Sequence, residues 1–179
     1  MKKLTLLLAA IALVMLSCTK KAATKTNDVT PPVITLGISA TIDGTNETFN
    51  TIDSAGYNNT STYYSLSIAA TSSAADTADY LQLALFNKTA IDTGTYIVGP
   101  GTYNPPYGPL IVYKLKSSTN FANDYVIDYT GAHTIQLHIT AISKTNIQGT
   151  FSGTLVVAAG TSGATKTITN GKFNVNVSQ

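Results

Sequence analysis

The fold of this chain is decided by residues 134–157, which read TIQLHITAISKTNIQGTFSGTLVV. Apolar residues take alternate positions in two successive segments, namely Ile135, Leu137, Ile139 and Ala141, then Ile147, Phe151, Leu155 and Val157. A period of two is the pattern of a β-strand with one buried face. Gly149 and Gly153 fall on the apolar side of the second segment, where a missing side chain permits a bend or a bulge. The sequence therefore predicts two half-buried strands.

The same alternation recurs in both directions from this stretch. Its apolar positions are Ile34, Leu36, Ile38, Ala40 and Ile42; Tyr64, Leu66, Ile68 and Ala70; Leu81, Leu83 and Leu85; Ile111, Tyr113 and Leu115. Asp43-Gly44 and Asn170-Gly171 are turn signals, and residues 172–177 alternate after the second of them. Residues 76–87 could also line one face of a helix, but the flanking strands favour a strand there.

These segments predict an all-β fold in a single domain over residues 34–179. Short connections imply antiparallel neighbours, so we expect an antiparallel meander of about eight to ten strands. Strands that each hide one face must curl or split into two layers, which predicts a flattened barrel or a β-sandwich.

The charge composition excludes one class of partner. The chain has no arginine, and beyond residue 30 the acidic residues outnumber the lysines. It therefore offers neither a basic stripe nor a guanidinium group for phosphate contacts, and we expect no nucleic-acid partner.

Residues 1–17 have the anatomy of a secretory signal peptide. Lys2 and Lys3 supply a positive start, and residues 4–16 form an apolar run interrupted only by Thr5. A helix of this length covers roughly 20 Å, which is short of the ~30 Å hydrocarbon core of a membrane. We expect this segment to be removed rather than to span a membrane.

Met15-Leu16-Ser17-Cys18 resembles the lipobox of bacterial lipoproteins, although Met15 stands where leucine is preferred. The resemblance implies cleavage before Cys18, a diacylglyceryl group on its thiol and an acyl chain on its amine, which together anchor a protein stably. Cys18 is the only cysteine, and lipidation would remove the liability of a lone exported thiol. The alternative is an ordinary signal peptide with an incidental cysteine.

Residues 18–33 are polar, rich in lysine and closed by Pro31-Pro32, which predicts a flexible tether after the lipidated cysteine. Thr19 is not the aspartate that favours retention at the inner membrane, and the following residues lack the acidic run that marks surface export in some bacteria. By resemblance to these sorting rules, we expect an outer-membrane lipoprotein of the cell envelope that faces the periplasm rather than the cell surface.

Three pieces of the strand ladder are distinctive together. They are residues 38–44 (ISATIDG), Gly94-Thr95-Tyr96, and residues 147–154 (IQGTFSGT) followed by residues 168–173 (ITNGKF). Their order resembles a domain-of-unknown-function family of small Bacteroidota lipoproteins, over nearly the whole domain. The resemblance implies an all-β envelope domain and supplies no catalytic residue.

The residues that could carry catalysis are few. His133 and His138 are the only histidines, and a spacing of five would place them on opposite faces of one strand, so we expect no joint metal site. No nucleophile motif accompanies a histidine. The aspartates mostly stand beside predicted turns, where they bond the backbone, although two carboxylates paired across strands would suit glycoside hydrolysis. We expect no enzyme and no cofactor.

The most distinctive loop is residues 99–109, GPGTYNPPYGP. Its Tyr103 and Tyr107 either offer flat faces to a sugar or peptide or cover the end of the core as part of a rigid connector. We expect a non-enzymatic binding or structural domain with a glycan or envelope protein partner. The alternatives are a carbohydrate-binding accessory that uses these two tyrosines and, if the interior is hollow, a lipocalin-like carrier.

Two tripeptides point to modification. Asp53-Ser54-Ala55 and Asp76-Thr77-Ala78 resemble the pattern used for O-glycosylation in the periplasm of Bacteroidota, and both stand in contexts that read as loops. The resemblance implies glycan attachment at Ser54 and Thr77.

Overall fold

The computed structural model of the chain describes residues 35–59, 64–74, 78–102, 107–159 and 163–178. Residues Ile34–Gln179 form one compact unit. Its elements are β1 (Gly37–Ile42), β2 (Thr45–Phe49), β3 (Thr51–Asn58), β4 (Tyr64–Thr71), β5 (Tyr80–Asn87), β6 (Gly94–Val98), β7 (Gly108–Lys114), the 3-10 turn η1 (Phe121–Asn123), β8 (Tyr125–Val126), β9 (Ile135–Ile142), β10 (Asn146–Val157) and β11 (Thr165–Asn176). The prediction of an all-β fold is confirmed. The described residues contain no helix that could span a lipid bilayer.

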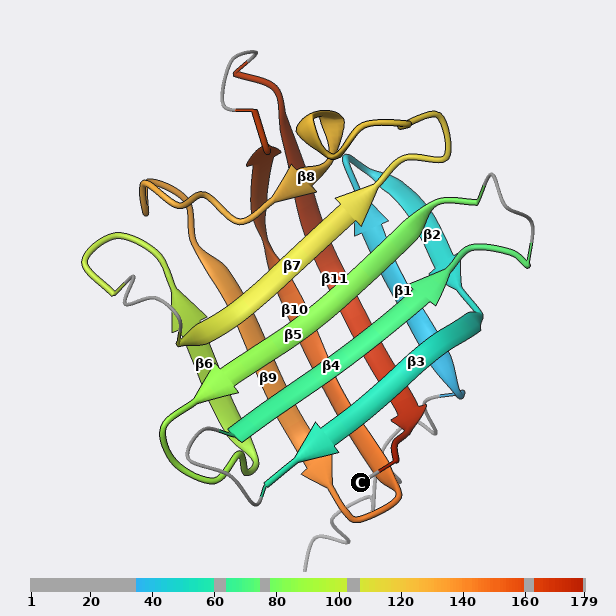
Figure 1. Ribbon diagram of the computed structural model, residues 1–179, viewed down its shortest axis with the longest axis vertical. Helices are drawn as coiled ribbons and strands as arrows, with labels where there is room; N and C mark the ends of the chain where they lie inside the picture. Colours follow the sequence, from blue (N-terminus) through green and yellow to red (C-terminus); the bar gives the residue numbers. More distant parts are fainter. Residues whose placement is uncertain (1–34, 60–63, 75–77, 103–106, 160–162, 179) are drawn as a thin grey trace, which may run out of the picture. The chain divides into compact units, whose positions relative to one another are not determined.

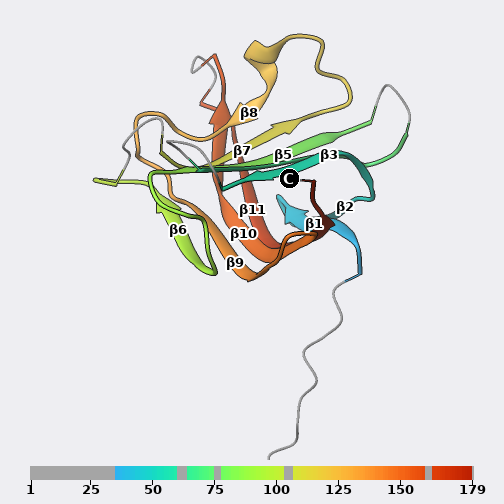
Figure 2. The same ribbon diagram turned by 60° about the horizontal axis from the view of Figure 1, so that its bottom comes forward.

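The strands form a flattened, nearly closed barrel whose two layers pack on each other (Figures 1 and 2). The layer nearer the viewer in Figure 1 has the order β3-β4-β5-β7, and the other has the order β2-β1-β11-β10-β9-β6. The short strand β8 joins the layers because it pairs with both β7 and the end of β10. All pairs between these strands are antiparallel, as predicted.

The order of strands departs from a simple meander, in which each strand pairs with the next one along the chain, and β8 for example pairs with β10 rather than with β9. β6 leaves the first layer and pairs with β9 in the second. β1 pairs with β11, from the other end of the domain. The structure has eleven strands, one more than the expected eight to ten. The additional strand is β8, whose two residues are too few to show an alternating pattern in the sequence.

The chain end closes the barrel on one side. The Ser178 amide donates to the Ala55 carbonyl at 3.1 Å, and the Tyr57 amide donates to the Ser178 carbonyl at 3.1 Å. These bonds form a short parallel bridge between the edge of β3 and the residues that follow β11. Two strands from opposite layers are thereby joined.

One continuous cluster of buried hydrophobic side chains lies between the layers, with contributions from both. Phe49 and Phe173 are its largest fully buried members. Phe49 meets Tyr113 edge to face, with ring centroids 6.4 Å apart, and the Tyr57 hydroxyl donates to the buried Ile91 carbonyl at 3.1 Å. The inward positions predicted for β4, β5 and β7 all belong to this cluster or pack against it.

The predicted core position Leu36 is wrong, since this side chain is 57% exposed. β1 begins one residue later at Gly37, whose φ of +130° is a conformation that residues with a side chain rarely adopt. The chain turns there, so the alternation of β1 does not extend back to Leu36. Ile34 lies outside the described residues.

Ala141 is likewise exposed rather than buried. The register between β9 and β10 shifts between Gln148 and Gly149, so that Thr140 is left without an opposite residue. An extra residue in a bulge reverses the faces that follow it. Ile142 therefore packs against the core where Ala141 was expected.

The turn predicted at Asn170-Gly171 is also wrong, because β11 runs through both residues from Thr165 to Asn176. Asn170 has a φ of +53°, and the pairing of β11 with β10 shifts between Phe151 and Gly153. The two residues form a bulge instead of a hairpin, since β1 and β10 pair with β11 on both sides of them.

Two other local predictions are confirmed. Asp43 and Gly44, with φ of 48° and 84°, form the two-residue turn of the β1–β2 hairpin. The helical alternative within residues 76–87 is excluded over Tyr80–Asn87, which forms β5, while residues 76 and 77 lie outside the described ranges.

Candidate functional site

A row of four outward side chains crosses the first layer from edge to edge. Thr51 on β3 stands opposite Thr71 on β4, Thr71 opposite Tyr80 on β5, and Tyr80 opposite Lys114 on β7. Neighbouring strands are about 4.8 Å apart, so the row spans roughly 14 Å. It places an aromatic ring between hydroxyl groups on one side and an ammonium group on the other.

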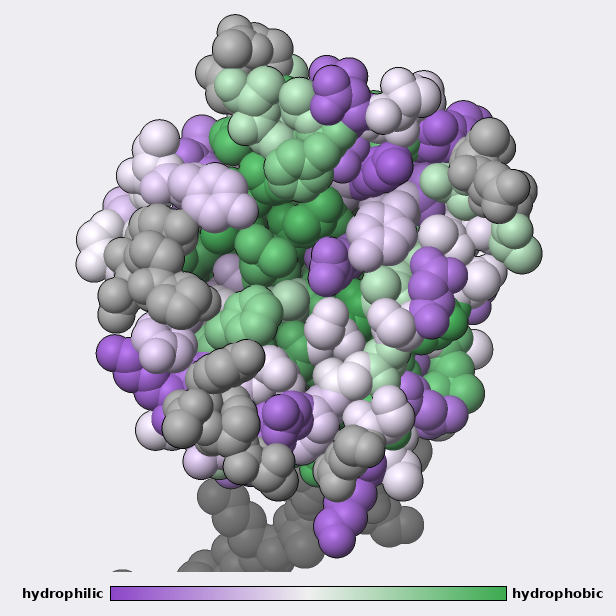
Figure 3. Space-filling model, viewed as in Figure 1, coloured by the Kyte–Doolittle hydropathy of each residue, from purple (hydrophilic) through white to green (hydrophobic). Residues whose placement is uncertain are grey.

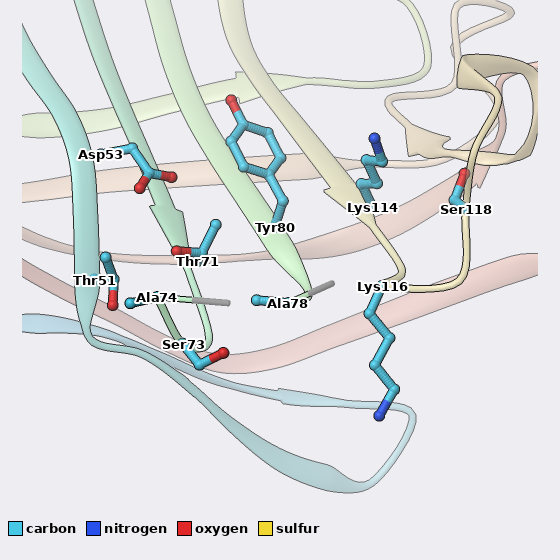
Figure 4. Close-up of a pocket in the computed structure, with 10 residues that line it drawn as sticks. All are labelled: Thr51, Asp53, Thr71, Ser73, Ala74, Ala78, Tyr80, Lys114, Lys116 and Ser118. Atoms are coloured by element: carbon cyan, nitrogen blue, oxygen red, sulfur yellow. The ribbon is translucent and has the colours of Figure 1, made fainter. Parts of the chain in front are cut away.

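This row forms the floor of a surface cavity of about 470 Å³, which we name the Tyr80 hollow (Figure 4). Asp53 adds a carboxylate on the β3 side of Tyr80, and Lys114 stands on the opposite side of the ring. Ser73, Ala74 and Ala78 from the β4–β5 connection, and Lys116 and Ser118 from the segment after β7, complete the lining. The volume is within the range of small-molecule sites.

Asp79 holds the rim of the Tyr80 hollow in place. Its amide donates to Ser72 Oγ at 3.1 Å, and the Ser72 amide donates to the Asp79 carbonyl at 2.8 Å. The Asp79 carboxylate accepts from the Lys116 amide at 2.6 Å and from the Tyr113 hydroxyl at 3.4 Å. The β4–β5 connection is thereby tied to the segment after β7.

Burial and nearby negative charges raise the pKa values of two tyrosines in this region. Burial raises the pKa of Tyr80, and the negative charge of Asp53 raises it further. Burial, followed by the charge of Asp79, also raises the pKa of Tyr113. Both hydroxyl groups therefore stay protonated at neutral pH and can donate hydrogen bonds.

The charged side chains of the Tyr80 hollow are not paired with one another. In the described part of the chain, the ion pairs are His133 with Asp128 and Lys166 with Asp43. Neither involves Asp53, Lys114 or Lys116. These three groups are thus available to a ligand.

Of the two tyrosines singled out in the 99–109 loop, Tyr103 lies outside the described residues. Tyr107 is half-buried, and the Lys88 ammonium group lies 4.7 Å from its ring centroid. A cation at that distance makes a cation–π contact and occupies one face of the ring. A sugar would have to displace Lys88 or use the other face.

The predicted modification sites have different contexts. Ser54 is exposed but lies within β3, not in a loop, and the register with β4 shifts between Ile52 and Ser54. The bulge leaves Asp53 and Ser54 both exposed. Thr77 and Cys18 lie outside the described residues.

The two histidines bond different partners in different parts of the fold. His138 on β9 contacts Thr95 Oγ1 on β6 through Nδ1 at 2.8 Å. His133 lies in the connection before β9, not in a strand, and contacts Asp128 through Nδ1 at 2.8 Å. Among the described residues, no cluster of three or more histidine, cysteine, aspartate or glutamate side chains could hold a metal ion.

Asp124 and Asp128 are buried carboxylates, and each accepts hydrogen bonds from residues near it in the chain. Asp124 accepts from Ser118 Oγ at 2.6 Å. Asp128 accepts from the Thr130 amide and hydroxyl, the Ala132 amide and His133. Neither carboxylate lines the Tyr80 hollow.

Valines stand opposite one another on three neighbouring strands beyond Lys114. Val112 on β7 is opposite Val126 on β8, which is buried and is opposite Val156 on β10. Figure 3 shows hydrophobic side chains gathered over β7 and β8. The interior of the barrel, in contrast, is occupied by the hydrophobic cluster, so the carrier alternative receives no support from it.

The Tyr80 hollow was not predicted from the sequence. Tyr80, Lys114 and Thr71 could be assigned to outward positions from the alternation of their strands, but not to neighbouring strands. Asp79, which organises the rim, carries no signal beyond its place between two strands. Scans against models of protein families, curated proteins and solved structures gave no match to this chain.

Proposed function

We propose that this chain is a cell-envelope lipoprotein, anchored to the outer membrane through lipid on Cys18 and facing the periplasm, whose β domain is a non-enzymatic saccharide-binding domain. The Tyr80 hollow is the proposed site. The observation that carries the binding role is the row Thr51, Thr71, Tyr80 and Lys114, which combines an aromatic face with hydroxyl and charged groups.

The chemistry of the hollow suits a saccharide. The face of an aromatic ring packs against the apolar C–H groups of a sugar ring, while polar groups around it bond the sugar hydroxyls. Tyr80 supplies the ring, Thr51 and Thr71 supply hydroxyl groups, and Asp53 supplies a strong acceptor. The earlier candidate site at Tyr103 and Tyr107 is the alternative for the same ligand class.

The binding proposal is tested by a glycan array with the purified protein and three variants. Tyr80→Ala should abolish the signal, because it removes the aromatic floor. Tyr103→Ala and Tyr107→Ala should retain it. The reverse result would move the site to the 99–109 loop, and an array without any signal from folded protein would remove the saccharide role.

The anchoring proposal is tested by cell fractionation. The unchanged chain should partition with the outer membrane, and Cys18→Ala should be recovered in a soluble fraction because the acyl chains are lost. Cys18→Ser is a second variant with the same expectation. Unchanged partitioning of both variants would contradict lipid anchoring.

The proposed glycans at Ser54 and Thr77 are tested by the intact mass of the native protein. Hexose-scale additions should disappear in steps with Ser54→Ala and Thr77→Ala. A native mass that exceeds the cleaved chain by lipid alone would exclude both modifications.

A further inference from the structure

The two walls of the Tyr80 hollow carry opposite charges. The β3 wall presents the Asp53 carboxylate, and the wall formed by β7 and the segment after it presents the ammonium groups of Lys114 and Lys116. Tyr80 separates the walls (Figure 4). A ligand that lies across the ring therefore meets a hydrogen-bond acceptor at one end and positive charge at the other.

The positive wall is not neutralised internally. Asp79 is the carboxylate tied to this segment, and its oxygens accept from the Lys116 amide and the Tyr113 hydroxyl. No described residue forms an ion pair with Lys114 or Lys116, whereas Lys166 is paired with Asp43 at 2.8 Å. Lys114 is half-buried and stands opposite Tyr80 in the pairing of β5 with β7.

From this arrangement we propose that the Tyr80 hollow selects acidic saccharides, with the carboxylate of a uronic acid bound on the Lys114 and Lys116 side and sugar hydroxyls donating to Asp53. The proposal rests on the saccharide-binding function above and adds the charge class and the orientation of the ligand. A charge-assisted bond between an ammonium group and a carboxylate is about twice as strong as a neutral hydrogen bond.

The test uses matched pairs of disaccharides titrated calorimetrically into the purified protein. One pair is α-1,4-digalacturonate and the neutral α-1,4-galactobiose, and the other is cellobiouronate and cellobiose. The acidic member should bind about tenfold tighter or more, which corresponds to one charge-assisted contact. Its advantage should shrink as salt is raised, because exposed charges are screened.

Variants locate the charge. Lys114→Gln combined with Lys116→Gln should remove the preference for the acidic member. The circular dichroism spectrum and melting temperature of this variant should match those of the unchanged chain, which shows that it is folded. Lys172→Gln, an exposed lysine on β11 in the other layer, is the matched control and should change nothing.

The outcomes separate this inference from the function on which it rests. Equal binding of both members, or a preference that survives the double lysine variant, overturns the acidic selectivity and leaves saccharide binding in place. If neither member of either pair binds, the selectivity is overturned, and the Tyr80-dependent array signal decides whether saccharide binding remains.

Discussion

Asp128 organises a whole connection through one buried carboxylate. Its two oxygens accept from the Thr130 amide, the Thr130 hydroxyl, the Ala132 amide and the His133 ring, at 2.6–3.1 Å. The bonds with Thr130 lower the pKa of Asp128 most, and the His133 contact lowers it further, against the opposing effect of burial, to about 2. The connection between β8 and β9 thus depends on the ionised form of this residue.

Asp128→Asn is expected to lower the free energy of unfolding by about 2 kcal/mol at pH 7, because the pKa of Asp128 is depressed from 3.8 to about 2 in the folded state. A carboxyl group whose pKa is lowered by folding stabilises the protein at pH values above its pKa in the unfolded chain. The contribution should therefore be present above about pH 4 and be lost as the pH falls towards 2. Urea denaturation of both proteins across this range measures it.

The matched control for this prediction is Asp92→Asn. Asp92 is exposed and accepts only from the Thr93 amide through its side chain among the bonds described, at 2.7 Å. Its replacement should have a much smaller effect. A difference between Asp128→Asn and the unchanged chain that is as large at pH 2 as at pH 7 would contradict the electrostatic account.

Strand β11 is the element on which the second layer is built, since it pairs with β1 on one side and β10 on the other. Its bulge at Asn170-Gly171 lets a twelve-residue strand bend around the core. A Cβ on Gly171 would lie 2.8 Å from the Phe151 ring and would also clash with the Phe151 carbonyl oxygen. Only glycine fits at that position.

Gly149 on the neighbouring strand β10 also leaves space for a phenylalanine ring, in this case that of Phe173. A Cβ there would lie 2.5 Å from the Phe173 ring and would clash with the His138 carbonyl oxygen. The glycines that fall on the apolar side of β10 therefore make room for large side chains of β11 and β9. Phe173 is fully buried as a result.

Asn170→Val is expected to destabilise the protein by about 1–2 kcal/mol, because a β-branched residue is disfavoured at the φ of +53° found there. Asn170→Gly should stay within about 0.5 kcal/mol of the unchanged chain, since glycine adopts this conformation freely. Thermal unfolding of the two variants compares them directly. Equal stability of the two variants would show that the bulge does not require a positive φ.

At the scale of the molecule, closure of the barrel depends on the last residues of the chain. Val177 is buried in the core, and Ser178 bonds the edge of β3. These bonds hold the last residues of the domain against β3, which lies in its first third. An opening at this seam would separate the two layers at one edge.

Removal of residues 177–179 is expected to lower the free energy of unfolding by about 3–4 kcal/mol, from the lost burial of Val177 and three lost backbone hydrogen bonds. The Tyr57 amide should also exchange its hydrogen faster, because its acceptor is the Ser178 carbonyl. Hydrogen exchange followed by NMR measures this locally.

Ser178→Ala is the control for the seam. It removes the bond from the Ser178 hydroxyl to the Ala55 carbonyl but keeps both backbone bonds. The Tyr57 amide should stay protected in this variant. Loss of protection there, or full protection after the truncation, would show that the backbone bridge does not close the barrel.

The residues that alternate within one strand were predicted well, as the inward sets of β4, β5 and β7 illustrate. The errors at Leu36, Ala141 and Asn170-Gly171 all arise where the backbone departs from a regular strand. A bulge depends on what the neighbouring strands do, so a single strand's sequence does not reveal it. The Tyr80 hollow was missed for a related reason, since it is made by the pairing of four strands.

Alternation is a local property of the extended backbone, so the all-β fold and the buried side of most strands could be read from short stretches of residues, and short connections indicated antiparallel neighbours. The folded chain was needed to show that β1 lies beside β11, that β6 joins the other layer and that Tyr80 lies between Thr71 and Lys114. Strand pairing depends on how the apolar faces of all strands can be buried together, and residues distant in the chain settle it jointly.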